Sequence, residues 1–293
     1  MRPEYQGDGW AIYLGDCVEV LAGMPQGVID CSIFSPPFSD LFVYSDSERD
    51  MGNCGSHAEF MDHYGYFARN LYRAMKPGRM TCVHCTDLPT RKGRDGFIGL
   101  HDFSGDLIKA HQDAGFVYHA RAVIWKDPVV EMQRTKALGL LYKQLRKDSA
   151  MSRVGMPDYM LFFRKDEANP EPITHEPEDL PVSMWQEMAS PVWMTVNQTR
   201  VLNGRLARGD RDEKHICPLQ LDVIDRCLTL YSNPGDLVMD PFNGIGSTGY
   251  QALKMGRRYI GSELKPEYAA QAARFMAEAE DSRWTLFDLA AAE

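Results

Sequence analysis

Long hydrophobic runs are missing from this sequence of 293 residues. No apolar stretch approaches the roughly 18–20 residues that cross a bilayer, so we expect no membrane partner. The first ten residues, MRPEYQGDGW, contain no apolar core, and we expect no signal peptide. The seven cysteines are odd in number and scattered, which argues against a disulfide framework and favours a reducing, cytoplasmic location.

An excess of positive charge is also missing, because 32 Lys and Arg residues stand against 41 Asp and Glu residues, and the formal net charge is -9. This acidic balance argues against nonspecific polyanion binding by the surface as a whole. Residues 121–153 are an exception, since eight basic residues face three acidic ones there. Such a segment is either a solvated basic face or a local contact with nucleic acid.

Metal-binding signatures are few. The eight histidines form no H-E-x-x-H pattern, and residues 54–57 and 82–85 only resemble the Cys/His spacings of zinc sites. The segment 82–85 lies at the end of a predicted strand, where Cys82 and Cys85 would face opposite sides of a sheet. We therefore expect no metal, and we interpret three other histidines as helix and strand surface: His101, His111 and His119.

Strand and helix signals alternate along the chain, which predicts an α/β fold with a largely parallel sheet. The predicted strands are Trp10–Leu14, Ile29–Phe34, Arg79–His84, Phe116–Trp125, Tyr159–Arg164, Leu237–Met239 and Arg258–Gly261. The predicted helices are His57–Met75, Asp102–Ala114, Leu219–Tyr231, Ser247–Met255 and Pro266–Ala279. Lys76-Pro77-Gly78 is a plausible stop for the first of these helices.

A glycine loop near the C-terminus is the clearest ligand signal. A predicted strand leads into Gly244-Ile-Gly246-Ser-Thr-Gly249, a helix follows, and a second strand ends at Glu263, 19 residues after the first glycine. This G-x-G-x-x-G spacing lets the backbone approach a ligand, and the acid is placed to bind ribose hydroxyls.

The residues just before the loop argue against a dinucleotide. Asp240 at the strand tip would repel a pyrophosphate and would suit an ammonium group. Phe242 adds a ring that can face a cation, and no G-K-[ST] completes a P-loop. S-adenosylmethionine, which has a ribose, positive charge and no phosphate, meets this description. An NAD-dependent oxidoreductase stays open as an alternative.

The segment Ser35-Pro36-Pro37-Phe38 ends a predicted buried strand with two prolines. Proline has no N–H and pushes the preceding residue to extended conformations, so this exit accepts hydrogen bonds and hardly donates them. Such a site suits an exocyclic amine, with Ser35 Oγ and the Pro36 carbonyl as acceptors and Phe38 as a stacking face. A plain proline turn at the end of a strand is the alternative.

Together the two motifs resemble those of the DNA amino-methyltransferases, which transfer methyl from S-adenosylmethionine to N4 of cytosine or N6 of adenine. Ser35–Phe38 matches the family's [DSN]-P-P-[YFW] catalytic motif, and Asp240–Thr248 resembles D-P-F-x-G-x-G-[ST]-T. The catalytic motif precedes the cofactor motif, which is the permuted order called the β class. Segments 13–17 and 214–218 resemble the family segments that meet the cofactor's adenine and methionine moieties.

The resemblance implies a Rossmann-like methyltransferase fold, formed as one domain over residues 1–293, with a small inserted DNA-recognition region at 127–211. It also implies flipping of the target base, direct attack of its amine on the sulfonium methyl, and no covalent intermediate, since the chain contains no Pro-Cys dipeptide. Ser35, as an acceptor, would need no activating base. Serine in the first motif position is more frequent in N4-cytosine members, so the implied product is N4-methylcytosine, with N6-adenine as the alternative.

The implied partners are double-stranded DNA and, as the family allows, a second copy of the chain and a restriction enzyme. A catalytically silent DNA-binding module is a further alternative, although both motifs are intact. The implied catalytic residues are Ser35, Pro36, Pro37 and Phe38. The implied cofactor-binding residues are Asp16, Cys17, Lys214, His215, Pro218, Asp240, Pro241, Phe242, Gly244, Gly246, Ser247, Thr248, Glu263 and Leu264. The candidate DNA-binding residues are Arg134, Lys136, Lys143, Arg146, Lys147, Arg200 and Arg205.

Overall fold

A computed structural model describes the chain except for residues 1, 40–49, 91, 203–217 and 291–293, and except for the side chains of 94, 134 and 283–290. The strands are β1 (Tyr5–Gly7), β2 (Trp10–Leu14), β3 (Ile29–Phe34), β4 (Met75–Cys85), β5 (Leu88–Pro89), β6 (Leu100–His101), β7 (Phe116–Ile124), β8 (Asp158–Lys165), β9 (Val192–Trp193), β10 (Leu237–Asp240) and β11 (Arg258–Glu263).

The α-helices are α1 (Cys17–Ala22), α2 (His57–Ala74), α3 (Lys92–Asp95), α4 (Phe103–Asp113), α5 (Pro128–Thr135), α6 (Tyr142–Lys147), α7 (Val182–Met188), α9 (Leu221–Tyr231), α10 (Ser247–Lys254) and α11 (Pro266–Ala290). Three short 3-10 turns are η2 (Met51–Asn53), η3 (Leu138–Leu140) and η4 (Ser149–Met151). None of the described helices is both long enough and apolar enough to cross a membrane.

The main sheet has nine strands in the order β1-β2-β11-β10-β3-β4-β8-β7-β9. The five strands from β2 to β4 in this order are mutually parallel, whereas β8 runs antiparallel to both β4 and β7. The prediction of a largely parallel α/β sheet is therefore confirmed. Because the carboxyl ends of parallel strands meet at one edge, the loops after β2, β3, β10 and β11 lie together.

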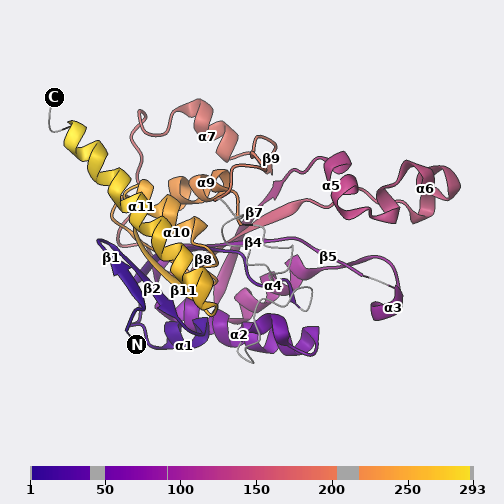
Figure 1. Ribbon diagram of the computed structural model, residues 1–293, viewed down its shortest axis with the longest axis horizontal. Coiled ribbons are helices and arrows are strands. Elements are labelled where there is room, and N and C mark those ends of the chain that lie inside the picture. Colours follow the sequence, from indigo (N-terminus) through magenta and orange to yellow (C-terminus); the bar gives the residue numbers. More distant parts are fainter. Residues whose placement is uncertain (1, 40–49, 91, 203–217, 291–293) are drawn as a thin grey trace.

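Helices cover both faces of this sheet (Figure 1). On one face, α9, α10 and α11 pack on side chains such as Ile33 and Cys82. On the other face, α1, α2 and α4 pack on Phe34, Val83 and Cys85. Cys82 and Cys85 thus point to opposite faces, as the strand periodicity predicts.

The start of β4 differs from the prediction. Lys76, Pro77 and Gly78 follow α2 as expected, but they lie inside a strand that already begins at Met75. The pairing of β3 with β4 passes from Ile29↔Met75 to Cys31↔Met80, so the extra residues form a bulge, where proline is tolerated.

His111 is also placed differently from the prediction, because it is fully buried rather than on the surface. Its ring stacks on Phe163 at a centroid distance of 4.1 Å, and Nδ1 lies 2.9 Å from the Leu107 carbonyl oxygen. Burial lowers the pKa of His111 to about 4, so this histidine is a neutral core residue at neutral pH.

Candidate active site

A cavity of about 200 Å³ lies at the carboxyl edge of the parallel strands. Its walls come from the turns after β2, β3, β10 and β11, together with Asp50–Met51 and Pro218–Leu219. The predicted site residues that line it are Asp16, Cys17, Ser35, Pro36, Pro37, Phe38, Pro218, Asp240, Pro241, Phe242, Gly244, Ser247, Thr248, Glu263 and Leu264. The cavity thus joins the proline motif to the glycine loop, 209 residues apart from Ser35 to Gly244.

Neighbouring strands explain this meeting. β10 and β3 pair directly, with Val238 opposite Cys31 and Met239 opposite Ser32, so their C-terminal loops emerge side by side. The Ser32 hydroxyl group donates a hydrogen bond of 3.0 Å to the Met239 carbonyl oxygen, which links the two strands just below the cavity.

The three glycines of the loop each have a structural reason. Gly244 and Gly246 have φ of 51° and 87°, a region that L side chains rarely adopt. Gly249 lies on α10, where an added Cβ would meet the Tyr259 ring at 2.4 Å and Met276 Sδ at 2.7 Å. The first two glycines therefore shape the turn, and the third allows α10 to approach β11 and α11 closely.

Two acids, the buried Asp240 and the half-buried Glu263, meet at the glycine loop. Asp240 Oδ1 accepts a hydrogen bond from the Phe242 N–H at 2.9 Å. Glu263 accepts from the N–H groups of Gly244 at 2.7 Å and Lys265 at 2.9 Å. Burial raises the pKa of each carboxyl group to about 7, although these hydrogen bonds, and for Asp240 one with Thr248, act to lower it. A cationic ligand would favour the ionised forms.

Ser35 is held by a chain of polar side chains that runs into the sheet. Its Oγ lies 3.1 Å from His84 Nδ1, at the end of β4. His84 Nε2 in turn lies 3.3 Å from Asp158 Oδ2, an ion-pair distance without a well-aligned hydrogen bond. Lys126 contacts the other oxygen of Asp158. Burial by itself would raise the pKa of Asp158, but His84 and Lys126 hold it below its ordinary value.

The family model N6_N4_Mtase, described as a DNA methylase, matches residues 29–274. The chain belongs to this DNA methylase family. It is 39% identical over 290 residues to the Type II methyltransferase M.XycI of Xanthomonas campestris pv. cyanopsidis, a match that covers 90% of this chain and 87% of the relative. Two other curated relatives are matched over only 22% and 56% of their own length.

Solved structures confirm the Rossmann-like methyltransferase fold. TTHA0409 of Thermus thermophilus, complexed with S-adenosyl-L-methionine, has a TM-score of 0.69 and 22% identity, covering 92% of this chain and 93% of the other. The cytosine-N4-specific PvuII DNA methyltransferase has a TM-score of 0.65 and 22% identity, covering 94% of this chain and 88% of the other. M.PvuII itself comes from Proteus hauseri.

Two polar residues of this site were not indicated by the sequence. His84 lies within the zinc-like spacing 82–85, which argues for no such role, and Asp158 belongs to no motif. Ser35, which was expected to need no activating base, nevertheless has His84 in contact with its hydroxyl group. The pairing of Phe34 with Val83 on adjacent parallel strands brings the next residues, Ser35 and His84, to the same sheet edge.

The candidate DNA-binding residues fall into three groups. Four are exposed on or near the α5–α6 arm, which projects from the sheet (Figure 1): Lys136, Lys143, Arg146 and Lys147. Arg200 is instead held by Asp222 and Asp225 of α9, each at 2.5 Å. The described residues do not include Arg205, Lys214 or His215, and the Arg134 side chain is also outside them. Gly246 shapes the turn without lining the cavity.

The range 127–211 is structurally mixed. β8 and β9 belong to the main sheet, whereas the segment from α5 to η4 lies outside it (Figure 1). This outer segment, which we call the basic arm (128–151), contains five basic and two acidic residues.

Proposed function

We propose that this chain is an S-adenosylmethionine-dependent DNA amino-methyltransferase that methylates N4 of cytosine within a specific sequence. The observation that carries the proposal is the single cavity shared by Ser35–Phe38 and the glycine loop. This cavity offers one wall for the amine and another for the methyl donor.

The cofactor wall fits S-adenosylmethionine through its chemistry. Asp240 and Glu263 are acids placed among apolar and backbone groups, which suits a ligand with positive charge and hydroxyl groups. A dinucleotide would bring its phosphates against these carboxylates, so the NAD alternative is disfavoured. When bound, S-adenosylmethionine supplies an electrophilic methyl group. The solved relative complexed with S-adenosyl-L-methionine supports this assignment.

The catalytic wall is built to receive an exocyclic amine. When His84 carries its proton on Nε2, which faces Asp158, its Nδ1 accepts a hydrogen bond from the Ser35 hydroxyl group. The lone pairs of Ser35 Oγ and of the Pro36 carbonyl then face the amine. Two acceptors draw the nitrogen lone pair out of conjugation with the ring, and Phe38 offers a face for stacking. The flipped base would reach this wall from outside the duplex.

The same chain of residues is placed to take up a proton. An amine that gains a methyl group must lose one proton, and Ser35 with His84 leads from that nitrogen toward Asp158. His84 and Asp158 act through Ser35 and are therefore positioning residues in this proposal.

Cytosine is the preferred base because Ser35 occupies the first motif position and because the PvuII relative is cytosine-N4-specific. Adenine N6 is the second candidate, since the family model covers N6 and N4 methylases together. The basic arm (128–151) is proposed to contact DNA phosphates, within a recognition region at 127–211. A homodimer and an accompanying restriction enzyme are further proposed partners, and both come from the family resemblance.

The test is mass spectrometry of nucleosides from DNA treated with the protein and isotopically labelled cofactor. We expect labelled N4-methylcytosine; labelled N6-methyladenine would select the second candidate, and no labelled nucleoside would refute the proposal. Ser35→Ala should lower the methylation rate about 100-fold or more while leaving the cofactor Kd nearly unchanged. Ser190→Ala, which changes a half-buried serine outside the cavity, is the matched control.

A further inference from the structure

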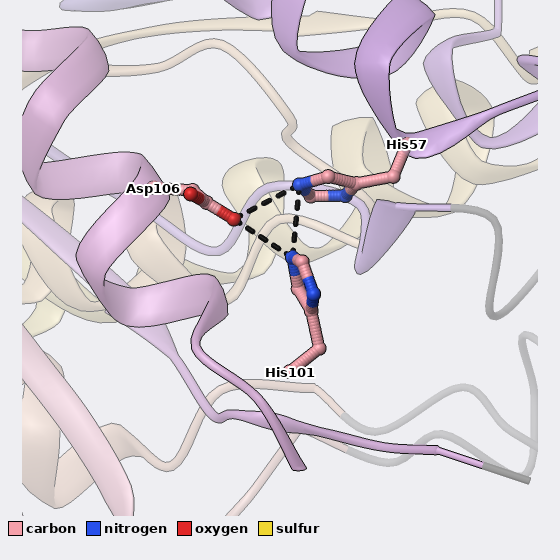
Figure 2. A group of neighbouring side chains, drawn as sticks. All are labelled: His57, His101 and Asp106. Carbon is pink, nitrogen blue, oxygen red and sulfur yellow. Dashed lines mark hydrogen bonds and ion pairs between the residues drawn. The ribbon is translucent and has the colours of Figure 1, made fainter. Parts of the chain in front are cut away.

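Two histidines and an aspartate from three separate elements converge on one point (Figure 2). His57 is the first residue of α2, His101 ends β6, and Asp106 lies in the first turn of α4. His57 Nε2 lies 2.9 Å from Asp106 Oδ2, His101 Nε2 lies 2.8 Å from the same oxygen, and the two Nε2 atoms are 3.0 Å apart.

With Asp106 as a carboxylate, hydrogen bonds cannot satisfy this triangle. A carboxylate oxygen only accepts, and each Nε2 atom carries at most one proton. If both nitrogens donate to Asp106, two donors face each other across 3.0 Å. If one nitrogen has no proton, its lone pair faces the carboxylate oxygen at 2.9 Å or less. A cation that receives all three lone pairs removes both conflicts.

The donor set and its size suit a divalent transition metal. Two imidazole nitrogens and one carboxylate oxygen form a common ligand set for zinc. For three donors about 2.9 Å apart, an ion about 2.05 Å from each lies about 1.2 Å out of their plane. That position leaves the far side for a fourth ligand, and the side chains are 29% to 41% exposed, so solvent can reach it.

The surroundings of His57 match those of a metal ligand. Its other nitrogen, Nδ1, lies 2.9 Å from the hydroxyl group of Ser39, and a proton on Nδ1 leaves Nε2 as the lone-pair donor. Ser39 is buried and has a φ of 53°, an uncommon value for serine, so this contact also holds the backbone just after Phe38. Phe60 and Phe103 pack on the ring of His57.

A second group of possible ligands lacks these properties. Asp30, Glu171 and Asp236 also come together, but Arg79 and Lys76 already lie among them at 2.7 to 3.3 Å. That group is neutralised by the protein's own cations.

We propose that His57, His101 and Asp106 bind one zinc ion, which clamps α2, β6 and α4 together and fixes the backbone after the proline motif through Ser39. The proposal does not depend on methyl transfer, because metal binding is measured without DNA or cofactor. The sequence alone does not indicate this site, since His101 and Asp106 lie 44 and 49 residues beyond His57 and form no recognisable spacing.

The test uses the untagged full chain, treated with a chelator and then titrated with ZnCl₂ in a calorimeter. We expect one zinc ion per chain, and we expect Co²⁺ at the same site to give visible d–d absorption. His101→Ala and Asp106→Asn should each weaken zinc binding at least tenfold, and Ser39→Ala about 10- to 100-fold. His175→Ala removes an exposed histidine from the segment between β8 and α7 and should leave the affinity unchanged.

Two results would overturn the proposal. One is the lack of saturable binding at one ion per chain in the parent protein. The other is binding to His101→Ala and Asp106→Asn that is as tight as in the parent. Asp106→Asn preserves the shape of a partly exposed side chain, so it remains informative if His101→Ala fails to fold, which circular dichroism would show.

Discussion

Cofactor binding is expected to strengthen as pH rises through neutrality. The pKa values of Asp240 and Glu263 are both raised to about 7 by burial in the cavity wall. A group with pKa near 7 is roughly one tenth ionised at pH 6 and nine tenths ionised at pH 8. If the ligand binds only the ionised form, each group changes the Kd about tenfold over this range.

The direction in which the Kd changes with pH follows from these raised pKa values. A positively charged ligand favours the carboxylates, so binding releases protons and the Kd falls as pH rises. Two independent groups would give about a 100-fold change between pH 6 and pH 8. The stability of the ligand-free protein should change in the opposite direction, since the carboxyl groups titrate near pH 4 in the unfolded chain. Its free energy of unfolding should decrease as pH rises from about 4 to 7.

Calorimetry with S-adenosylmethionine at pH 6, 7 and 8 would measure this effect, and buffers of different ionisation enthalpy would count the protons released. Glu263→Gln is the matched control, because it removes one titrating group and keeps a side chain of the same size. The ratio of Kd between parent and variant cancels the titration of the ligand itself. A ratio that stays constant from pH 6 to pH 8 would refute the assignment of Glu263 as a titrating ligand-binding group.

Three further predictions concern packing, positioning and DNA contact. Gly249→Ala should destabilise the protein by about 1–3 kcal/mol in urea unfolding, because the new Cβ meets Tyr259 and Met276. Gly65→Ala on α2 meets only the flexible end of Arg69 and should stabilise by about 0.5–1 kcal/mol; equal effects of the two changes would contradict the packing argument. Asp158→Asn should lower kcat about tenfold or more with an unchanged cofactor Kd, and a changed Kd alone would speak against a positioning role. Replacing all three basic residues of α6 by Glu should weaken DNA binding and reduce its salt dependence, and an unaltered salt slope would exclude the basic arm (128–151) as a phosphate contact.

Much of the fold was already determined by the sequence. The strand signals in the sequence predicted seven strands, and the structure has a strand at each of these seven places. Two of them, β2 and β3, match the prediction residue for residue. The glycine loop and the proline motif were also recognisable, because each depends on local backbone properties. Positive φ favours glycine, and an acceptor-rich strand exit favours proline, so both are visible in a short stretch of sequence.

The short elements were harder to predict. The bulge at the start of β4 depends on pairing with β3, which a single strand does not reveal. The edge strands β1 and β9 have three and two residues, too few for a periodic pattern. The burial of His111 likewise depends on Phe163 and other side chains that lie far along the chain.

The sequence by itself determined two local shapes, a glycine loop that would suit a cationic nucleoside ligand and a proline-containing strand exit that would suit an amine. Only the tertiary structure decided which polar groups serve them. His84 and Asp158 reach Ser35 through the neighbouring strands β4 and β8, and His57, His101 and Asp106 converge from three elements. The physical reason is that local motifs record backbone constraints, whereas contacts between distant side chains arise only when the sheet brings its strand ends together.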